Sequence, residues 1–328
     1  MAFSLSIVIP NYNGKNLLQK NLPSLFAALE HCGSNWEVIV SDDASTDDSI
    51  AFLKKEYSVI KIIENKTNRG FSFTINEGFS LSKNDLVLAV NTDVSLDKNY
   101  FRHPLKYFEK ADTFGVAGSI YSEDGKTLQD AAKFPKKGFL KINTTKNYAL
   151  KKPTAEWIPS FFLSGANVLM DRKKLMLLQG METLYSPFYY EDSDLGLRAW
   201  KCGWHCYYEP QAVCYHPLSE TINKHNSRKK IKTIVRRNRF YFHAIHLDNL
   251  NLVFWYPSLV LHTVFRIFLM DVAYYKSLSL FLKAFPHVLQ TKKKNRELYL
   301  SQKNNNTSTE SVINTINDFA GKHPHILF

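Results

Sequence analysis

The chain has 328 residues, of which 45% are hydrophobic and 14% aromatic, which indicates a globular protein with a sizeable buried core. Its net charge of +12 lies almost entirely in the last third, because residues 1–216 carry 25 Lys+Arg against 24 Asp+Glu and residues 217–328 carry 17 against 6. The four cysteines form no CxxC pair, which favours free thiols over a zinc site, and the N-terminus lacks the basic and apolar regions of a secretory signal.

The first 120 residues alternate short apolar runs with segments of helical periodicity. Strands are predicted at residues 5–10, 36–40, 59–63 and 86–90. Helices are predicted at residues 17–29, after an N-cap at Ser45 or Thr46, and near residues 74–81. This alternation predicts parallel βαβ units. Three of the four strands end in Asp or Asn, so polar side chains should collect at the carboxyl edge of the sheet, where ligands bind.

Lysines are concentrated in the middle of the chain. Residues 133–152 contain seven lysines and no acidic residue, which predicts an exposed, mobile loop. Its lysines could face only solvent or could contact an anionic ligand, and the sequence leaves both interpretations open. Beyond this segment, strands are predicted at residues 166–170, 204–209 and 212–216, and an amphipathic helix at residues 192–202.

The character of the chain changes after residue 216. Residues 228–246 predict a basic helix, and residues 252–275 are very apolar and aromatic. The longest charge-free stretch, residues 249–265, has 17 residues, the bottom of the range for a membrane span. It predicts either a helix packed on the domain or a helix in the bilayer interface, and a true span is the least favoured interpretation. Residues 303–311 predict a polar linker.

Two common nucleotide-binding motifs, GxGxxG and GxxxxGK[ST], are absent from the sequence. Instead, seven motifs in order over nearly 240 residues resemble the family 2 glycosyltransferases, in particular the rhamnosyltransferase-like ones. They lie at residues 6–14 (SIVIPNYNG), 41–47 (SDDASTD), 68–71 (NRGF) with 76–78 (NEG), 91–93 (NTD), 190–198 (YEDSDLGLR) with 203–204 (GW), 215–219 (YHPLS) and 236–239 (RRNR).

The resemblance implies an α/β fold of the GT-A type, with a mostly parallel central sheet flanked by helices and a C-terminal helical extension. Residues 1–216 would form the catalytic domain, with a donor half at about 1–120 and an acceptor half at about 121–216. Residues 217–300 would form the basic, aromatic and membrane-associated extension. Residues 301–328 would form a polar linker and tail.

A divalent cation, Mn²⁺ or Mg²⁺, is expected between the donor phosphates. Asp93 stands where the family carries its Asp-x-Asp motif and is the predicted principal ligand, because these ions prefer oxygen. Asn91 occupies a position where an acid is more usual, so its oxygen is expected on the donor ribose or on a metal-bound water. His216 matches a late metal-binding histidine of the family and would favour Mn²⁺.

Asp192 is the predicted catalytic base that takes the proton from the acceptor hydroxyl. It stands at the start of a predicted helix, whose dipole should favour the ionised form. Glu191 is expected to orient the acceptor, and Asp194, two residues on, points away and should serve structure. One base opposite one leaving group implies single displacement with inversion.

The remaining contacts also follow from the resemblance. Either Asp42 or Asp43 should accept from the N3–H of the nucleobase, with Asp43 favoured. The predicted nucleotide and donor contacts are Pro10, Asn11, Tyr12, Asn13, Asp42, Asp43, Arg69, Gly70, Asn91 and Thr92. The predicted donor-sugar or acceptor contacts are Ser164, Gly165, Ala166, Asn167 and Trp157.

Together these features predict an inverting transferase that moves a sugar from a UDP- or dTDP-sugar to a hydroxyl of a lipid-linked or cell-surface glycan. The basic tail would hold the protein on the anionic inner face of the cell membrane, a peripheral cytoplasmic location. Asn91 leaves open an inactive nucleotide-sugar binder. A nucleic-acid partner is disfavoured, because the tail's aromatics lie in apolar blocks rather than among Arg and Lys. The oligomeric state is left open.

Overall fold

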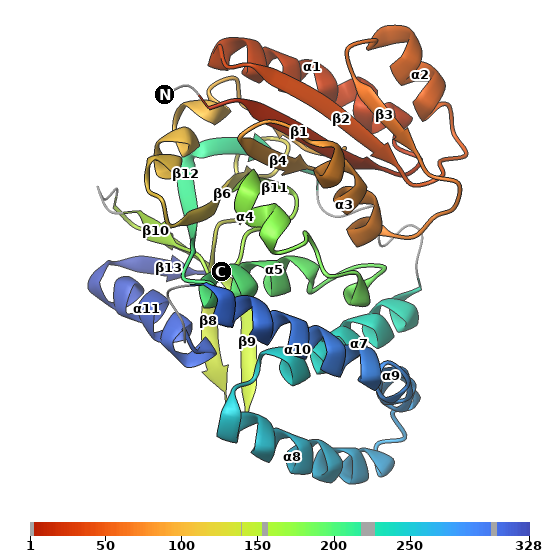
Figure 1. Cartoon of the computed structure of the whole chain (residues 1–328), viewed down its shortest axis with the longest axis vertical. Coiled ribbons are helices and arrows are strands. Elements are labelled where there is room, and N and C mark those ends of the chain that lie inside the picture. Colours follow the sequence, from red (N-terminus) through yellow and green to blue (C-terminus); the bar gives the residue numbers. More distant parts are fainter. Residues whose placement is uncertain (1–2, 139, 153–156, 218–226, 303–306) are drawn as a thin grey trace.

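The structure is a computed structural model that describes residues 3–138, 140–152, 157–217, 227–302 and 307–328. Among these residues, ten strands form one central sheet with helices on both faces, and three form a smaller sheet beside the C-terminal helices (Figure 1). The central path runs β10-β12-β6-β11-β4-β1-β2-β3, with β5 paired to β12 and β7 to β6. This is the expected α/β arrangement with a C-terminal helical region.

The N-terminal part of the central sheet is parallel, as the sequence predicts. Its strands are β1 (Leu5–Asn11), β2 (Trp36–Asp42), β3 (Lys61–Glu64) and β4 (Leu86–Val90). The helices that connect them are α1 (Lys15–Cys32), α2 (Ser49–Glu56) and α3 (Phe71–Leu81). Because β1 pairs in parallel with both β2 and β4, the carboxyl ends of these strands meet at one edge of the sheet.

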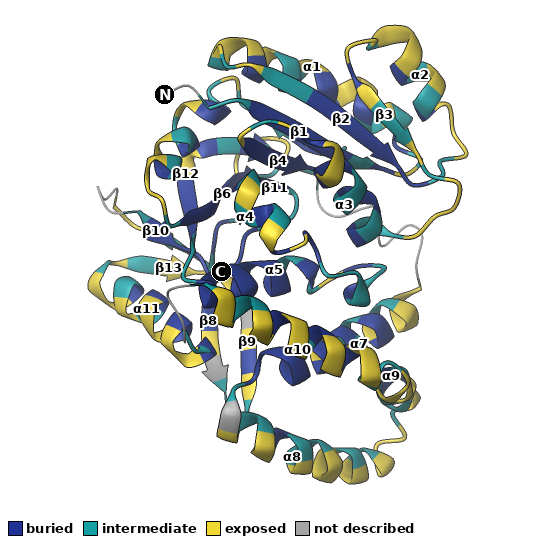
Figure 2. Ribbon diagram, viewed as in Figure 1, coloured by how far each residue is buried: buried dark blue, intermediate teal, exposed yellow. Residues whose placement is uncertain are grey.

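Alternate residues of these strands pack into two separate cores, one on each face of the sheet. Val8 and Ile39 pack on the face that α3 covers, whereas Ile7 and Val38 pack on the face that α1 covers. Both faces are therefore buried, which explains the unbroken apolar runs in the sequence. Figure 2 shows the strands as buried ribbons between helices that are exposed on their outer sides.

The second half of the sheet mixes parallel and antiparallel pairs. Its elements are β5 (Ser95–Leu96), β6 (Thr113–Tyr121), β7 (Leu128–Asp130), β10 (Ile158–Pro159), β11 (Asn167–Asp171), α4 (Arg172–Leu177), α5 (Glu191–Lys201) and β12 (His205–Tyr215). β11 lies antiparallel between β4 and β6, so it begins at the edge where β4 ends. The two strands predicted around Pro210 form one strand, because a register shift between Glu209 and Val213 accommodates the proline.

The prediction of a mobile loop at residues 133–152 is wrong. Most of this segment forms a hairpin of β8 (Ala132–Gly138) and β9 (Lys141–Leu150), and β13 (His325–Leu327) adds to β9. Ile142 and Tyr148 are buried under the C-terminal helices, while Lys141 and Lys146 face solvent. The prediction relied on the number of lysines and overlooked the few apolar residues that one face of the hairpin buries.

The C-terminal helices are α7 (Arg228–His246), α8 (Asn249–Ile267), α9 (Val272–Lys283), α10 (Phe285–Ser301) and α11 (Thr309–Lys322). They share a core with the acceptor half, since Phe281 and Val312 belong to the same buried cluster as Tyr148. The predicted linker at 303–311 lies partly outside the described residues. Its end is helical, because the Ser308 side chain caps α11. None of the helices in the described ranges is long and apolar enough to cross a bilayer.

Candidate active site

Buried side-chain oxygens without hydrogen-bond partners gather at the carboxyl edge of β1 and β4. They are Oδ1 of Asn11 at the end of β1, Oδ1 of Asn91 and Asp93 just after β4, and Oδ1 of Asn167 at the start of β11. The antiparallel pairing of Asn167 with Val90 brings the last of these to the same edge. A buried oxygen without a hydrogen-bond partner costs free energy of folding. We therefore expect this edge to bind a ligand that supplies hydrogen-bond donors, or a cation.

Asp93 and His216 meet at this edge. The end of β12 pairs with β5, and the pairing of Tyr215 with Ser95 carries His216 back to the loop after β4. His216 Nε2 lies 3.2 Å from Asp93 Oδ2, and both side chains are largely buried. Asp93 Oδ1 has no hydrogen-bond partner among the residues that the structure describes. The sequence therefore predicted two residues that the fold brings together across more than a hundred positions.

These two side chains fit a divalent cation that is shared with a phosphate ligand. A carboxylate oxygen and an imidazole nitrogen suit Mn²⁺, and ligand oxygens and water commonly complete its coordination. Across the described part of the chain, no group of three or more His, Cys, Asp or Glu side chains could hold a metal alone. The donor set is thus incomplete without a ligand.

Asn91 and Thr92 are held by their backbones rather than by their side chains. The Asn91 N–H donates to the Ala166 carbonyl at 3.2 Å, and Asn21 Nδ2 donates to the Thr92 carbonyl at 2.9 Å. The Asn91 side-chain oxygen remains without a partner. An amide oxygen can accept a hydrogen bond from a sugar hydroxyl or from a bound water, so the predicted contact of Asn91 stays a prediction.

The loop after β1 is joined to the loop after β2 through Asp42. Asn11 Nδ2 donates to Asp42 Oδ2 at 2.7 Å, and Ser45 donates to both carboxylate oxygens. Asn13 accepts from the backbone of Thr46 at 2.7 Å. The predicted cap of α2 at Ser45 or Thr46 is wrong, because Asp42 and Asn13 already bond to these residues and α2 begins at Ser49. Asp42 therefore shapes the loop, and Tyr12 stays 40% exposed beside it.

Asp43 holds a second loop. Its two carboxylate oxygens accept from the backbone N–H groups of Arg69 and Gly70, both at 2.9 Å. Gly70 has a φ of +90°, and a Cβ there would lie 2.7 Å from Ser186 Oγ, so glycine is required. Ser186 Oγ in turn donates to the Arg69 carbonyl at 2.9 Å. The loop that Asp43 fixes thus touches the segment that leads into α5.

Glu191 and Asp192 begin α5, and both are withdrawn from water. Burial raises the pKa of both carboxyls, and the nearby Asp192 raises that of Glu191 further. Ser193 N–H donates to Asp192 Oδ1 at 2.6 Å and favours the charged form, as the helix dipole should. The expectation that the helix start would favour ionised Asp192 is nevertheless overturned, because burial has the larger effect. A carboxylate with a raised pKa is a stronger proton acceptor.

The backbone before Glu191 is left-handed at two successive tyrosines, Tyr189 at φ 70° and Tyr190 at φ 80°. Such conformations cost non-glycine residues about 1 kcal/mol or more each. Fully buried Asn238 of α7 offsets this, because its Nδ2 donates to backbone carbonyls at 2.7, 3.0 and 2.8 Å, those of Tyr185, Phe188 and Tyr189. Arg237 donates to Asn238 Oδ1 and to the Ser186 carbonyl. The predicted Arg-Asn motif thus clamps the segment before Glu191.

Asp194 lies in a buried network beneath α5. Arg198 Nε donates to it at 2.6 Å, and His246 Nε2 lies 2.7 Å from its other oxygen. Burial alone would raise the pKa of Asp194, but Arg198 and His246 lower it below its ordinary value. Arg198 also donates to the carbonyls of Leu178 and Gly180. These contacts match the structural role expected of Asp194.

Asp130 and Lys133, which the motif series did not include, lie close to Asp192. After burial, Lys133 is the largest influence on the pKa of Asp192 and lowers it, while Asp130 raises it. Asp130 also raises the pKa of Cys214, two residues before His216, to which burial contributes most. The only sequence signal is an Asp three residues before a Lys.

The predicted sugar contacts fall into two places. Residues 164–167 form a turn at the sheet edge, with the Asn167 N–H donating to the Ser164 carbonyl at 3.3 Å and Ala166 accepting from Asn91. Trp157 instead packs against Tyr107, with the ring centroids 4.3 Å apart and the ring planes tilted by 39°. It lies beside the middle of β12, several residues before His216, on the order of 20 Å away along the strand. The structure thus brings together the turn residues but not Trp157.

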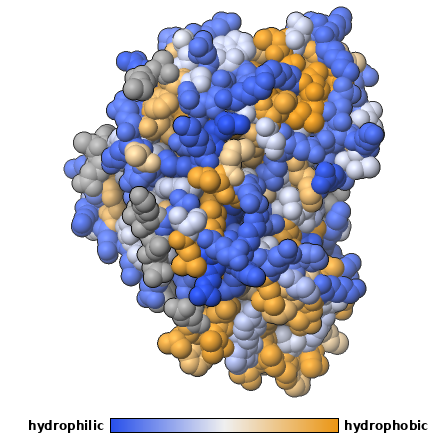
Figure 3. Space-filling view, in the orientation of Figure 1, coloured by the Kyte–Doolittle hydropathy of each residue, from blue (hydrophilic) through white to orange (hydrophobic). Residues whose placement is uncertain are grey.

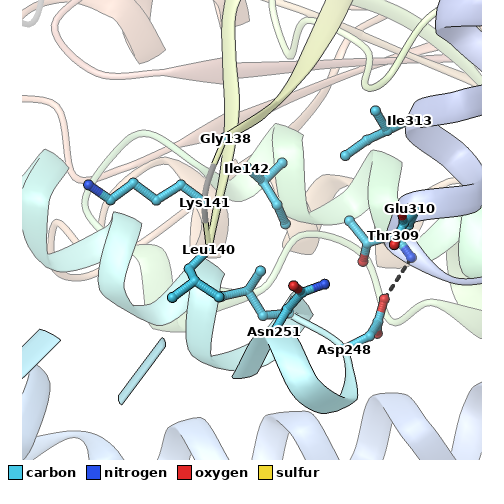
Figure 4. A pocket seen from close by; sticks show the side chains of 10 residues that line it. Gly138, Leu140, Lys141, Ile142, Asp248, Asn251, Thr309, Glu310 and Ile313 are labelled. Atoms are coloured by element: carbon cyan, nitrogen blue, oxygen red, sulfur yellow. Dashed lines mark hydrogen bonds between the residues drawn. The ribbon is translucent and has the colours of Figure 1, made fainter. Parts of the chain in front are cut away.

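A separate small cavity lies between the hairpin and the C-terminal helices (Figure 4). Its volume is about 20 Å³, which is room for little more than one water molecule. The figure shows Asp248 at its edge, accepting from the Thr309 N–H at 2.7 Å. This cavity contains none of the predicted site residues and is too small for a nucleotide.

Comparison with known proteins gives a family match over just over half of the chain. The model described as Glycosyl transferase family 2 matches residues 6–176. An undecaprenyl-phosphate 4-deoxy-4-formamido-L-arabinose transferase of Salmonella enteritidis is 33% identical over 122 residues, 35% of this chain and 36% of that protein. The putative glycosyltransferase EpsE of Bacillus subtilis is 27% identical over 129 residues, 37% of this chain and 45% of that protein. The chain thus matches less than half the length of these relatives.

Solved structures of similar fold cover nearly the whole chain. GalNAc-T7, crystallised with UDP, GalNAc and Mn²⁺, aligns with 98% of this chain and 58% of its own at a TM-score of 0.65 and 14% identity. The mannosyltransferase PcManGT of Pyrobaculum calidifontis, with GDP-Man and Mn²⁺, aligns with 98% and 87% at 0.53 and 14%. S. aureus TarS 1–349 with UDP-GlcNAc aligns with 98% and 92% at 0.54 and 15%. At these identities the likeness establishes the fold alone.

Proposed function

The chain belongs to glycosyl transferase family 2, and from this premise we propose that it moves a sugar from a nucleotide-diphosphate donor to an acceptor hydroxyl with inversion. The observation that carries the proposal is the meeting of Asp93 and His216 at the carboxyl edge of the sheet. The carboxyls of Glu191 and Asp192, whose pKa values burial raises, would supply the proton acceptor. A donor-phosphate site beside a proton acceptor is the arrangement that glycosyl transfer needs.

The donor, a UDP- or dTDP-sugar, would lie along the ends of β1, β2 and β4. The unpartnered Asn11 oxygen and the exposed Tyr12 ring are available to its nucleoside, and the loop that Asp43 holds would close over the base. Arg69, whose side chain is 49% exposed and lies 3.4 Å from Glu77, would contact a phosphate. The turn at residues 164–167 would contact the sugar. Trp157 is not assigned to the donor.

Asp93 and His216 would hold a divalent cation, Mn²⁺ or Mg²⁺, and a solved structure of similar fold contains Mn²⁺. Such an ion neutralises the diphosphate and makes it a better leaving group. Asp93 Oδ1 is the chain's own oxygen directed to that position. Asn91 keeps the local charge lower than two acids would, which leaves its amide oxygen for the ribose or a bound water.

Asp192 would take the proton from the acceptor hydroxyl as that oxygen attacks the anomeric carbon. Burial raises its pKa and makes it a better base than an exposed carboxylate. Glu191, which keeps one oxygen without a partner, would accept a hydrogen bond from the acceptor and orient it. Attack from the face opposite the leaving diphosphate inverts the configuration.

The acceptor we infer is a hydroxyl of a lipid-linked or cell-surface glycan. Two observations support it: a relative in Salmonella acts on undecaprenyl phosphate, and the C-terminal helices are basic and apolar. An inactive nucleotide-sugar binder is the alternative, favoured by Asn91 in place of an acid. It shares the donor site but not the proton transfer at Asp192.

A panel of nucleotide sugars with Mn²⁺ tests both readings. The matching donor should raise the melting temperature of the full chain by mass action, and donor turnover should follow with Mn²⁺ present. Asp192→Asn should lower turnover by about 10²-fold or more while leaving the donor-induced melting shift in place. Asp124→Asn, at an exposed turn, is the matched control and should behave as wild type.

Two results would contradict the proposal. If no donor shifts the melting temperature, the donor site is wrong. If a donor binds but wild type and Asp192→Asn turn it over equally slowly, the chain is the inactive binder.

A further inference from the structure

Helix α8 presents a continuous apolar surface to solvent. Its exposed apolar side chains recur at intervals of three and four residues, and we call them the α8 ridge: Leu250, Val253, Phe254, Val260, Leu261, Val264, Phe265 and Phe268. Each is between 53% and 79% exposed. Apolar atoms gather at the end of the molecule that α8 forms (Figure 3). Contiguous exposed apolar surface of this kind marks an interaction site.

The opposite face of α8 is tied to the body of the protein. Trp255 is 3% exposed, and its ring lies 6.2 Å from that of Phe281 in α9. Thr263 shares a hydrogen bond of 2.8 Å with the Tyr274 hydroxyl, and its carbonyl accepts from Tyr275 at 2.8 Å. The ridge therefore points outward because the helix is anchored from behind, and not because the helix is unfolded or loosely attached.

Positive charge surrounds the ridge. Residues 249–270 contain one arginine and no acidic residue, and residues 228–283 contain ten Lys or Arg and two acids. Two acids flank α8 in the sequence, and both are already paired. Asp271 accepts from Arg236 at 2.7 Å and from Arg266 at 2.9 Å, and Asp248 accepts from Lys201 at 2.7 Å. Burial lowers the pKa of His262 in the middle of α8, and four cations add to this effect: Arg266, Lys141, Arg239 and Arg236. The surface around the ridge therefore attracts anions.

We propose that the α8 ridge docks on an anionic lipid bilayer, with its apolar side chains in the interface and the surrounding cations among the headgroups. A helix with one apolar face and cations beside it lies in the plane of an interface rather than across it. A second copy of this chain is a poorer occupant, because pairing two ridges would bring the same positive charges together. A nucleic acid would satisfy the cations but leave the ridge in water.

This inference rests on the proposed function in one respect only. The docked bilayer would carry the lipid-linked acceptor that the proposed transfer uses. The docking itself uses none of the residues assigned to the donor, the cation or the base. Vesicle binding and sugar transfer can therefore fail independently, and each can be measured without the other.

Co-sedimentation of the full chain with vesicles tests the docking. The chain should bind vesicles of phosphatidylcholine mixed with phosphatidylglycerol far better than phosphatidylcholine alone, and added salt should weaken this binding. The combined substitution Leu261→Asp and Phe265→Asp should weaken it by about tenfold or more, because two apolar anchors are lost. Val59→Asp, at a side chain 56% exposed in the N-terminal half, is the matched control and should bind as wild type.

A second pair of variants tests whether the docking needs positive charge. Lys232→Glu lies on α7 close enough to influence Asp271, and it should weaken binding to the mixed vesicles several-fold. Lys66→Glu, which is exposed far from α8 in the sequence, should have a smaller effect. All variants replace exposed side chains, so their melting temperatures should match wild type, and a variant that melts early is replaced by Phe265→Ser alone.

Three results would overturn the proposal. Equal binding to neutral and mixed vesicles would show that the partner need not be anionic. Full binding by the Leu261→Asp and Phe265→Asp variant would show that the α8 ridge is not the docking surface. A wild-type dimer that becomes a monomer on ridge substitution, with no vesicle binding in either form, would identify a second copy of the chain as the occupant.

Discussion

At the scale of single residues, the pair Glu191 and Asp192 shows how burial and charge set the chemistry of a site. Adjacent positions in a helix place their side chains about 100° apart, so the two carboxyls can share one pocket without pointing in the same direction. Burial raises the pKa of each, and like charge adds to that of Glu191. Asp194, two residues on, has its pKa lowered by Arg198 and His246 although it is more deeply buried than either. Its neighbours, rather than its depth, decide the difference.

The activity should therefore depend on pH in a way that Asp130 influences. Because Asp192 must be ionised to accept a proton, the acid limb of kcat/KM should lie above the ordinary carboxylate range of about 4. Asp130→Asn removes a negative charge that raises the pKa of Asp192, so the limb should move to lower pH. A pH series of donor turnover measures this. Glu109→Gln, at an exposed position, should leave the limb in place, and an unmoved limb in Asp130→Asn would refute the influence of Asp130 on Asp192.

Several site residues were predictable because each ends or follows a recognisable strand. Asp93 follows an apolar run, and His216 follows another, and parallel strands bring such ends to one edge. Asp130 and Lys133 were not predictable in this way, because their place beside Asp192 depends on the pairing of β6 with β7. Trp157 stays a prediction, and its packing against Tyr107 shows that nothing in the sequence signals which partner an aromatic residue between strands would contact.

At the scale of elements, the segment before α5 depends on α7 for its shape. Asn238 donates to three carbonyls of this segment, and Arg237 holds the Asn238 oxygen. Asn238→Ala leaves these carbonyls without a buried donor and should lower the free energy of unfolding by roughly 1–3 kcal/mol. Urea unfolding measures the loss, and hydrogen exchange should rise at residues 185–190 in particular.

Asn143→Ala, in the exposed part of the hairpin, is the matched control for this change and should have little effect on either measurement. If exchange at residues 185–190 stays the same in Asn238→Ala, the segment does not need the clamp.

The elements themselves were mostly legible from the sequence, and the failures have a common cause. Local apolar patterns predict the strands β1, β2 and β4 and the helix α7, because each of these elements buries apolar side chains at regular intervals. The hairpin of β8 and β9 was missed because its burial depends on α11 and β13, from the far end of the chain. The cap of α2 was misplaced because Asp42 and Asn13 compete for the residues that would have capped it. Local sequence patterns do not predict contacts between residues that are far apart in the chain.

At the scale of the whole molecule, the C-terminal helices and the hairpin form one core, and His243 joins them. Its Nε2 accepts from the Ile142 N–H at 3.1 Å, which requires a neutral ring. Burial, together with nearby Arg239 and Lys141, lowers the pKa of His243 to about 3. The folded pKa lies below the unfolded value of about 6.5, so this contribution to stability is complete above pH 6.5 and is lost as pH falls.

Lowering the pH from 7 to 5 should therefore reduce the free energy of unfolding by about 2 kcal/mol through His243 alone. His243→Gln cannot be protonated, so its stability should fall less over this range, although it starts lower. Urea unfolding at the two pH values measures both slopes. The exposed His287→Gln is the control, and identical slopes in wild type and His243→Gln would contradict the assignment.

The hydrogen bond from Ser186 to the Arg69 carbonyl has a consequence for substrate binding. It joins the loop that Asp43 fixes beside the proposed nucleotide to the loop that Asn238 fixes before the proposed base. A donor that shifts the Arg69 loop would also shift the Ser186 loop, so each substrate would alter the affinity of the other by the same factor. Such coupling would appear as a donor dissociation constant that changes with acceptor concentration, and Ser186→Ala would weaken it.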